Sequence, residues 1–242
     1  MVCDLPRTEI FTFFEAEEGE KMEFRLVYQG PLPPEKCEPK DAVLGAGKGR
    51  AKDKHRLRKH FHLQMRELWH QHPDLRRQAD LPCYRSPRGF VFLPQEFPPG
   101  ATNVKKYVDF IADDHQRCGG RFVPLVSEQG GFTCALDILF LRRDAPGNLI
   151  ENGGDIDNRI KVLLDGLRIP KNISELGGFA IDADEDPFYC LLEDDRLVTR
   201  ISVTTDRLIV PKQADENIND VLLVIQVTVV NPSSIFAGGR LV

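Results

Sequence analysis

The sequence predicts an α+β fold in which a small mixed or antiparallel sheet packs with helices. Two observations support this prediction. Apolar residues recur at helical spacing in two segments, and four other segments carry the β-branched and aromatic residues that favour strands. The chain has 242 residues, of which 41% are hydrophobic, so it can bury one sizeable core. It holds no apolar run of about 18 residues, which excludes an ordinary transmembrane helix.

The two helical segments are residues 48–68 and, within residues 152–167, the part that follows Asp157. In the first, one stripe of apolar residues is expected to face the core: Leu57, Phe61, Met65 and Leu68. Trp69 is expected to be a core or boundary residue. In the second, the buried stripe is formed by Ile156, Ile160, Leu163, Leu164 and Leu167.

The four strand segments are spread along the chain. They read MEFRLVYQG, FTCALDILFL, RLVTRISVTTDRLIV and DVLLVIQVTVV. The last two follow each other closely, so residues 197–229 are predicted to form a closing antiparallel hairpin. Residues 70–131 are rich in turn formers around a brief strand, and NVKKYVDFIADDHQRC within them is expected to be helical.

These segments predict a single domain over residues 23–230. An acidic extension precedes it at residues 1–22, a tail follows at 231–242, and residues 70–131 and 171–193 are predicted to be insertions. The N-terminus lacks the layout of a secretory signal, and the six cysteines include no C-x-x-C pair. We therefore expect a cytoplasmic protein with reduced thiols and no membrane partner.

One strongly basic segment opens the first helix of a chain whose net charge is −5. Its cations are Lys48, Arg50, Lys52, Lys54, Arg56, Arg58 and Lys59, against the single acid Asp53. They are candidates for binding a nucleic-acid backbone, and a merely solvated helix end is the alternative. The nearby histidines are expected to be solvated or to face DNA, with zinc binding a weaker alternative: His55, His60, His62, His70 and His72.

A cluster of charged residues accompanies the second helix. Asp155 and Asp157 lie at its start, and Lys161 and Asp165 follow at four-residue intervals. In the simplest interpretation Asp157 caps the helix, Lys161 pairs with it, and Asp165 extends a solvated row. Alternatively, the two first carboxylates share a divalent cation such as Mg²⁺, which relieves their repulsion, and Lys161 neutralises a phosphate.

A second acidic pair, Asp194 and Asp195, stands just before a predicted strand. Acidic residues at this position commonly belong to turns. A carboxylate there would also complete a metal site if the fold returned it to the start of the helix. The metal-site hypothesis therefore requires residues 155 and 195 to converge.

The order of these motifs resembles the RusA-type Holliday-junction resolvases. The resemblance rests on DIDNRIKVLLD, which fits D-x-D-N-x-x-K-x-x-x-D, followed by EDDRLV. It implies that Asp155, Asp157, Asp194 and Asp195 bind metal, that Asp155, Asp157, Asp195 and Lys161 are catalytic, and that Asp165 belongs to the same acidic site. The expected ion is Mg²⁺, with Mn²⁺ as an alternative.

The resemblance also implies an activity and partners. We expect a homodimeric endonuclease that hydrolyses phosphodiester bonds of branched DNA in recombination and repair. The chain departs from the family in its two insertions and in the residues before the D-x-D motif, NLIENGG. Two alternatives stay open: a metal-dependent nuclease for other DNA or RNA structures, and a non-catalytic DNA-binding or assembly module.

Overall fold

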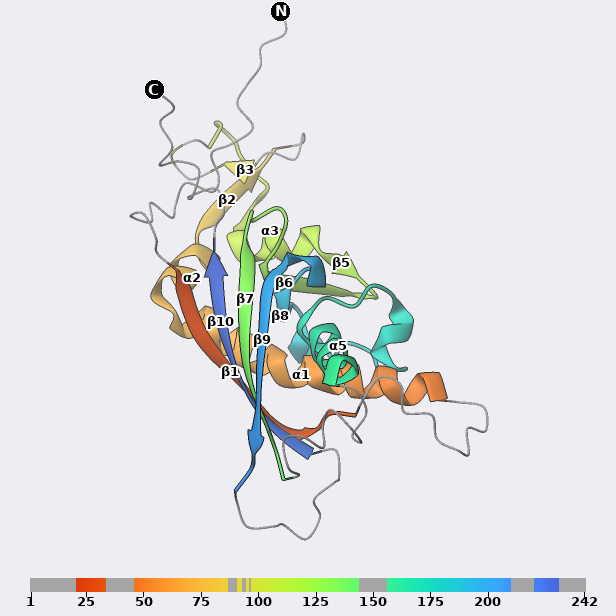
Figure 1. Ribbon diagram of the computed structural model, residues 1–242. Helices are drawn as coiled ribbons and strands as arrows, with labels where there is room; N and C mark the ends of the chain where they lie inside the picture. The colour runs from red at the N-terminus through yellow and green to blue at the C-terminus, as the bar shows by residue number, and fades with distance from the viewer. Residues whose placement is uncertain are drawn as a thin grey trace, which may run out of the picture.

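A four-stranded sheet forms one layer of the protein (Figure 1). The computed structural model describes residues 21–33, 46–86, 91–92, 95, 97–143, 156–209 and 220–230. The sheet contains β1 (Met22–Pro31), β7 (Thr133–Arg142), β9 (Val198–Arg207) and β10 (Asp220–Val230), in the order β1-β10-β7-β9. Because β10 is antiparallel to both neighbours while β9 runs parallel to β7, the sheet is mixed, as the α+β prediction allows.

The predicted hairpin between the last two strands is wrong, because β7 lies between β9 and β10. Burial explains this order. Alternate residues of β10 are fully buried and most of the others are partly buried, which is typical of a central strand, and β10 pairs with β1 on one side and β7 on the other. Most residues of β9 are exposed, which is typical of an edge strand. Closeness in sequence thus predicted the wrong neighbour.

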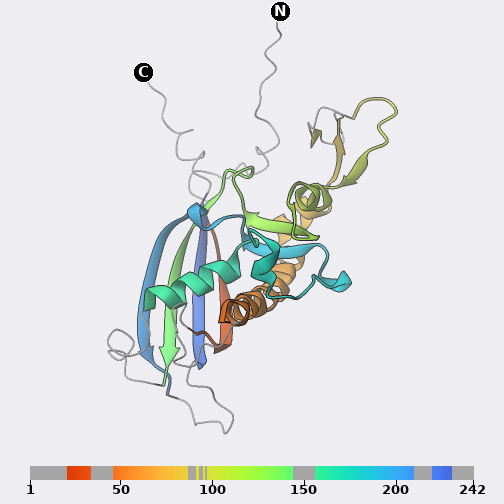
Figure 2. The same ribbon diagram turned by 90° about the vertical axis from the view of Figure 1, so that its right-hand side faces the viewer.

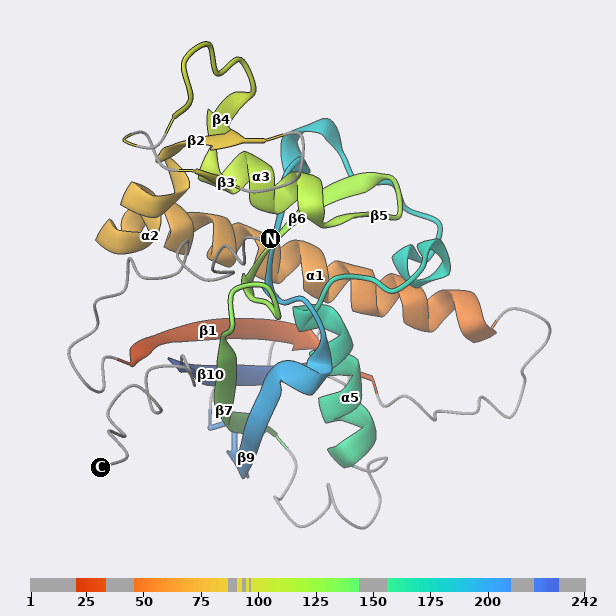
Figure 3. The same cartoon turned by 90° about the horizontal axis from the view of Figure 1, so that it is seen from above.

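Two helices cover one face of this sheet. They are α1 (Ala46–Gln71) and α5 (Ile156–Leu167), and both apolar stripes expected from the sequence join the main core. Leu57, Met65 and Leu163 are fully buried. Figure 2 shows that α5 begins over β9 and runs across the strands toward α1, and Figure 3 agrees. The start of α5 therefore lies at the β9 edge of the sheet.

A second layer covers the other side of α1, as Figures 2 and 3 both show. Its centre is a parallel pair, β6 (Gly120–Val126) and β8 (Phe188–Leu192). Around it lie α2 (Pro73–Ala79), α3 (Tyr107–Asp114), β5 (Gln116–Arg117) and a small sheet of β2 (Pro82–Arg85), β3 (Val91–Phe92) and β4 (Val104–Lys106). The helix expected over NVKKYVDFIADDHQRC is thus confirmed in its centre only, as α3. The segments 70–131 and 171–193 meet in this layer.

Three short 3₁₀ turns complete the described elements: η2 (Ile173–Leu176), η3 (Ala183–Glu185) and η4 (Asp195–Leu197). The C-terminal tail and most of the N-terminal extension lie outside the described residues. Within the described part of the chain, no helix is both long and apolar enough to span a membrane.

Candidate functional site

The outward face of α5 carries the first half of the charged motif. Asp157 and Lys161 are exposed and lie one turn apart, while Ile160 and Leu163 face the core. The helix begins at Ile156, so Asp157 lies in its first turn rather than at the predicted N-cap. Asp155 lies outside the described residues. The exposed pair is the part of the expected site that the structure places in solvent.

Asp165 does not extend this solvated row, because it is buried between α1 and α5. Its carboxylate lies 2.6 Å from Lys54 Nζ and accepts a hydrogen bond from Arg168. Burial alone would raise the pKa of Asp165, but the hydrogen bond from Lys54 and the charge of Arg168 lower it below its ordinary value. Asp165 is therefore a buried structural anion in this fold.

A further pair extends the ion network around Asp165. Arg58, which is 1% exposed, donates to both the backbone and the carboxylate of Glu175 at 2.9 Å, and to the carbonyl of Arg168 at 3.2 Å. Arg168 also contacts the Glu175 carboxylate at 3.2 Å. These contacts join α1 to the chain that follows α5. No pattern in the sequence indicates that Glu175 serves as the counter-ion of these two arginines.

This network changes the interpretation of the basic segment. Arg58 is buried and Lys54 is tied to Asp165, so neither is placed to bind a DNA backbone. Lys59 pairs with Asp182 and Glu185. The fold thus uses three of the seven cations of the predicted DNA-binding segment to hold its own acidic residues, and DNA binding by the segment stays a prediction.

The remaining cations of the segment have mixed positions. Lys52 is exposed, and Arg56 is exposed although it contacts Asp53 at 3.0 Å. Arg50 is partly buried, and the side chain of Lys48 lies outside the described residues. Lys52 and Arg56 are thus the two members of the segment that the structure exposes to solvent.

The second acidic pair lies at the opposite end of α5 from Asp157. Arg168, the first residue after the helix, forms an isolated parallel β-bridge with Leu192. In addition, the Ile169 N–H donates to the Leu192 carbonyl at 3.0 Å. Beyond the helix, Lys171 lies 3.4 Å from Asp194 and 3.6 Å from Asp195. The 12 residues of α5 rise about 18 Å between its two ends.

The structure therefore does not bring Asp195 to the start of α5, and one ion cannot bind both ends of that helix. The chain positions β8 beside β6 and the end of α5, which carries Asp194 and Asp195 away from Asp157. Asp194 instead caps η4 by accepting from the Arg196 N–H at 3.1 Å. Burial alone would raise the pKa of Asp194, but this hydrogen bond, the neighbouring Asp195 side chain and the charge of Lys171 together lower it below its ordinary value.

Two histidines of α1 are buried rather than solvated. His55 and His62 are each 1% exposed, and their rings stack near Phe188 of β8. His62 Nδ1 accepts from the Tyr189 N–H at 2.9 Å, so this nitrogen is unprotonated. Burial lowers both pKa values to about 4. The expectation of solvated or DNA-facing histidines is wrong at these two positions, because β8 covers the second face of α1.

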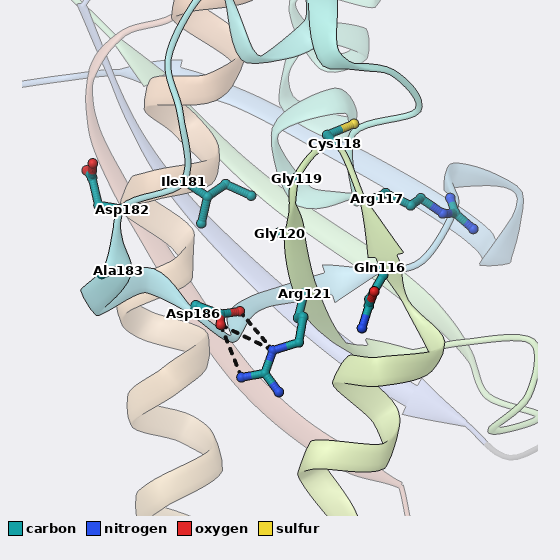
Figure 4. Close-up of a pocket in the computed structure, with 10 residues that line it drawn as sticks. All are labelled: Gln116, Arg117, Cys118, Gly119, Gly120, Arg121, Ile181, Asp182, Ala183 and Asp186. Carbon is teal, nitrogen blue, oxygen red and sulfur yellow. Dashed lines mark hydrogen bonds and ion pairs between the residues drawn. The ribbon is translucent and has the colours of Figure 1, made fainter.

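A separate hollow of about 700 Å³ lies between the β5–β6 turn and residues 181–186 (Figure 4). Arg121 lies on its wall and pairs with Asp186 at 3.1 Å and Asp113 at 3.5 Å. A Cβ atom at Gly120 would come within 2.3 Å of the terminal methyl group of Ile181, so a larger residue there would require the Ile181 side chain to move. None of the residues that the sequence suggested for catalysis, metal or DNA lines this hollow.

Comparison with known proteins returned no match: no family model, no curated protein and no solved structure corresponds to this chain. Within the described residues, no group of three histidine, cysteine, aspartate or glutamate side chains is arranged to hold a metal ion. What supports a function is therefore the motif itself and the positions of its residues.

Proposed function

We propose that this chain is a Mg²⁺-dependent endonuclease that cuts branched DNA, as its resemblance to the RusA-type resolvases implies. The observation that carries the proposal is the exposure of Asp157 and Lys161 on one turn of α5. The motif places a carboxylate and an ammonium group together in solvent, at the end of the helix where Asp155 precedes them in the sequence. In metal-dependent hydrolysis of a phosphodiester, carboxylates can hold the metal ion and an ammonium group can stabilise negative charge on the phosphate.

Asp157 and Asp155 would hold the ion, because Mg²⁺ in proteins uses one or two carboxylates and takes its remaining ligands from water and phosphate. When bound, the ion polarises the phosphate and lowers the pKa of water. Lys161 lies one turn further along the same face and would stabilise negative charge on the phosphate. Lys52 and Arg56, exposed on α1, would bind the DNA backbone.

The hypothesis drawn from the sequence required Asp195 to converge with Asp155. The present proposal differs from it, because the ion is held by the two carboxylates at the start of α5 without Asp195, and that difference makes it testable. Purified protein is incubated with labelled four-way junction, linear duplex and single strand, with Mg²⁺ or with EDTA. We expect Mg²⁺-dependent cutting of the junction, its loss in Asp157→Asn and Lys161→Ala, and its retention in Asp195→Asn. Loss in Asp195→Asn at unchanged stability would show that the site needs a carboxylate from the far end of α5.

A second candidate is a DNA-binding or assembly module without catalytic activity. The separation of Asp195 from Asp157 favours it, because a site with fewer carboxylates holds an ion more weakly. The same experiment distinguishes the two functions. Junction binding without cutting, in any divalent ion, would support the module and contradict the nuclease.

A further inference from the structure

The face of the main sheet that points away from the helices carries a band of apolar residues. Figure 2 shows α1 and α5 on one side of the sheet, so side chains that alternate with the core residues of each strand point to the other side. Five of these outward side chains are apolar and lie on the neighbouring strands β1, β10 and β7: Val27, Leu222, Val224, Leu139 and Leu141. We call this set the outer band.

The strand register places the members of the outer band side by side. Val27 pairs with Val224, which pairs in turn with Leu139. Leu222 pairs with Leu141 in the next row of the same face. Val27 is 44% exposed and Leu139 is 37% exposed, and the other three are partly exposed. A continuous apolar surface over three strands is typical of a site that another segment covers.

An exposed cation borders the outer band. Arg25 lies two residues before Val27, on the same face of β1. Its guanidinium donates to the neutral side chain of Gln226 at 3.2 Å, and no carboxylate among the described residues pairs with it. A segment that brings both apolar side chains and an acid would therefore complement the outer band and this arginine together.

We propose that residues 9–15 of the same chain, EIFTFFE, cover the outer band. They lie outside the described residues, and they precede β1 in the sequence. Four of them are large and apolar: Ile10, Phe11, Phe13 and Phe14. These side chains would leave water on the outer band, while Glu9 or Glu15 at the ends of the segment would face Arg25. The segment predicted to be an acidic extension would then be part of the domain.

The length of chain between this segment and β1 allows the contact. Phe14 precedes Met22 by eight residues, which span up to about 26 Å when extended. Val27 follows Met22 by five residues, or about 17 Å along β1. The connection is therefore long enough to turn back at the start of β1 and to reach the outer band.

The segment that follows β10 fits the outer band less well. Its apolar pair, Ile235 and Phe236, follows Val230 by five and six residues. Val224 lies six residues back along β10, so a chain returning to it would have no residues left for the reversal. Residues 231–242 also contain no aspartate or glutamate that could face Arg25. Length and charge thus favour the segment that precedes β1.

Photo-cross-linking of the full chain tests this contact. Phe13 is replaced by the photoreactive residue p-benzoyl-phenylalanine, and the dilute protein is irradiated, digested and analysed by mass spectrometry. We expect cross-links within one chain to the strands that carry the outer band. Val27→Arg should remove most of them, because it places a charge in the apolar contact. Val104→Arg is the matched control, since this valine of β4 is 40% exposed, and it should leave the cross-links unchanged.

Binding of the apolar dye Nile red provides a second measurement. A variant with Phe11, Phe13 and Phe14 all changed to serine should bind more dye than the wild type, because the outer band is then uncovered. Unchanged dye binding would overturn the proposal. Cross-links from position 13 that form only between chains or only outside the outer band, or that do not form, would also overturn it. The same probe at Phe236 should not reach the outer band, and a band reached from Phe236 alone would identify the C-terminal segment as the occupant and contradict the proposal. No DNA is used, so the result is independent of the proposed nuclease.

Discussion

Replacing Asp165 separates a structural role from a catalytic one. The side chain is 10% exposed and contacts Lys54 and Arg168, which are 16% and 5% exposed. In Asp165→Asn the charge disappears and both cations lose an anion. Removing one member of a buried ion pair costs about 3–5 kcal/mol. Arg168 keeps Glu175 as a partner and Lys54 reaches some solvent, so we expect the lower end, about 3 kcal/mol.

The assay is thermal and denaturant unfolding of Asp165→Asn beside the wild type. For a chain of this size, 1 kcal/mol shifts Tm by about 2–4 °C, so the expected loss is about 6–12 °C. The matched control is Asp157→Asn, the same change at an exposed position of the same helix, which should alter stability by less than about 0.5 kcal/mol. An Asp165→Asn protein as stable as the control would refute the structural assignment.

Three further outcomes rest on burial, on packing and on an exposed surface charge. Burial above all, with a nearby arginine, lowers the pKa of His55 and His62 to about 4 from 6.5, so folding favours their neutral forms. The contribution of these histidines to the free energy of unfolding should be fully present above pH 6.5 and should fall toward pH 4 by up to about 3 kcal/mol per histidine. A free energy of unfolding that does not change between these pH values would contradict this. Gly166→Ala should destabilise by about 1–3 kcal/mol in denaturant titrations, because its Cβ would lie 2.7 Å from that of Leu57. Lys52→Ala should lower, by about 1, the magnitude of the slope of the logarithm of the junction-binding constant against the logarithm of salt concentration. Filter binding at several salt concentrations measures this slope.

The sequence predicted most elements of the main layer but not their arrangement. The content of β-branched and aromatic residues identified all four strands, and apolar spacing identified both long helices, since periodicity reports which residues of a segment face a core. It does not report how many neighbours a strand has. The position of β10 between β1 and β7 depends on pairing between distant segments, which the sequence of a single strand does not show.

The charged residues were harder to predict, for a related reason. A helix with one apolar face is expected to leave its polar residues in solvent. However, α1 lies between two layers and is covered on two faces. His55, Arg58 and His62 are therefore buried on its second face. His55, His62 and Trp69 are spaced seven residues apart, and this spacing was the one sign in the sequence that α1 has a second buried face.

The spacing of residues along the sequence could not predict whether carboxylates that are distant in the chain lie close together in the fold. The resemblance placed Asp195 with Asp157 by motif order, while the bridge between Leu192 and Arg168 places it at the other end of α5. Asp165 was assigned to the same acidic site because it stands in the motif, and the fold uses it to hold Lys54 and Arg168. Long-range contacts decided each of these positions.

The binding of Mn²⁺, followed by electron paramagnetic resonance, tests most directly whether the start of α5 is a metal site. The wild type, Asp165→Asn and Asp195→Asn should bind the ion with similar affinity, because those two carboxylates lie away from Asp157. Asp157→Asn should lose it. Equal binding by Asp157→Asn and the wild type, or loss of binding in Asp195→Asn alone, would contradict the account.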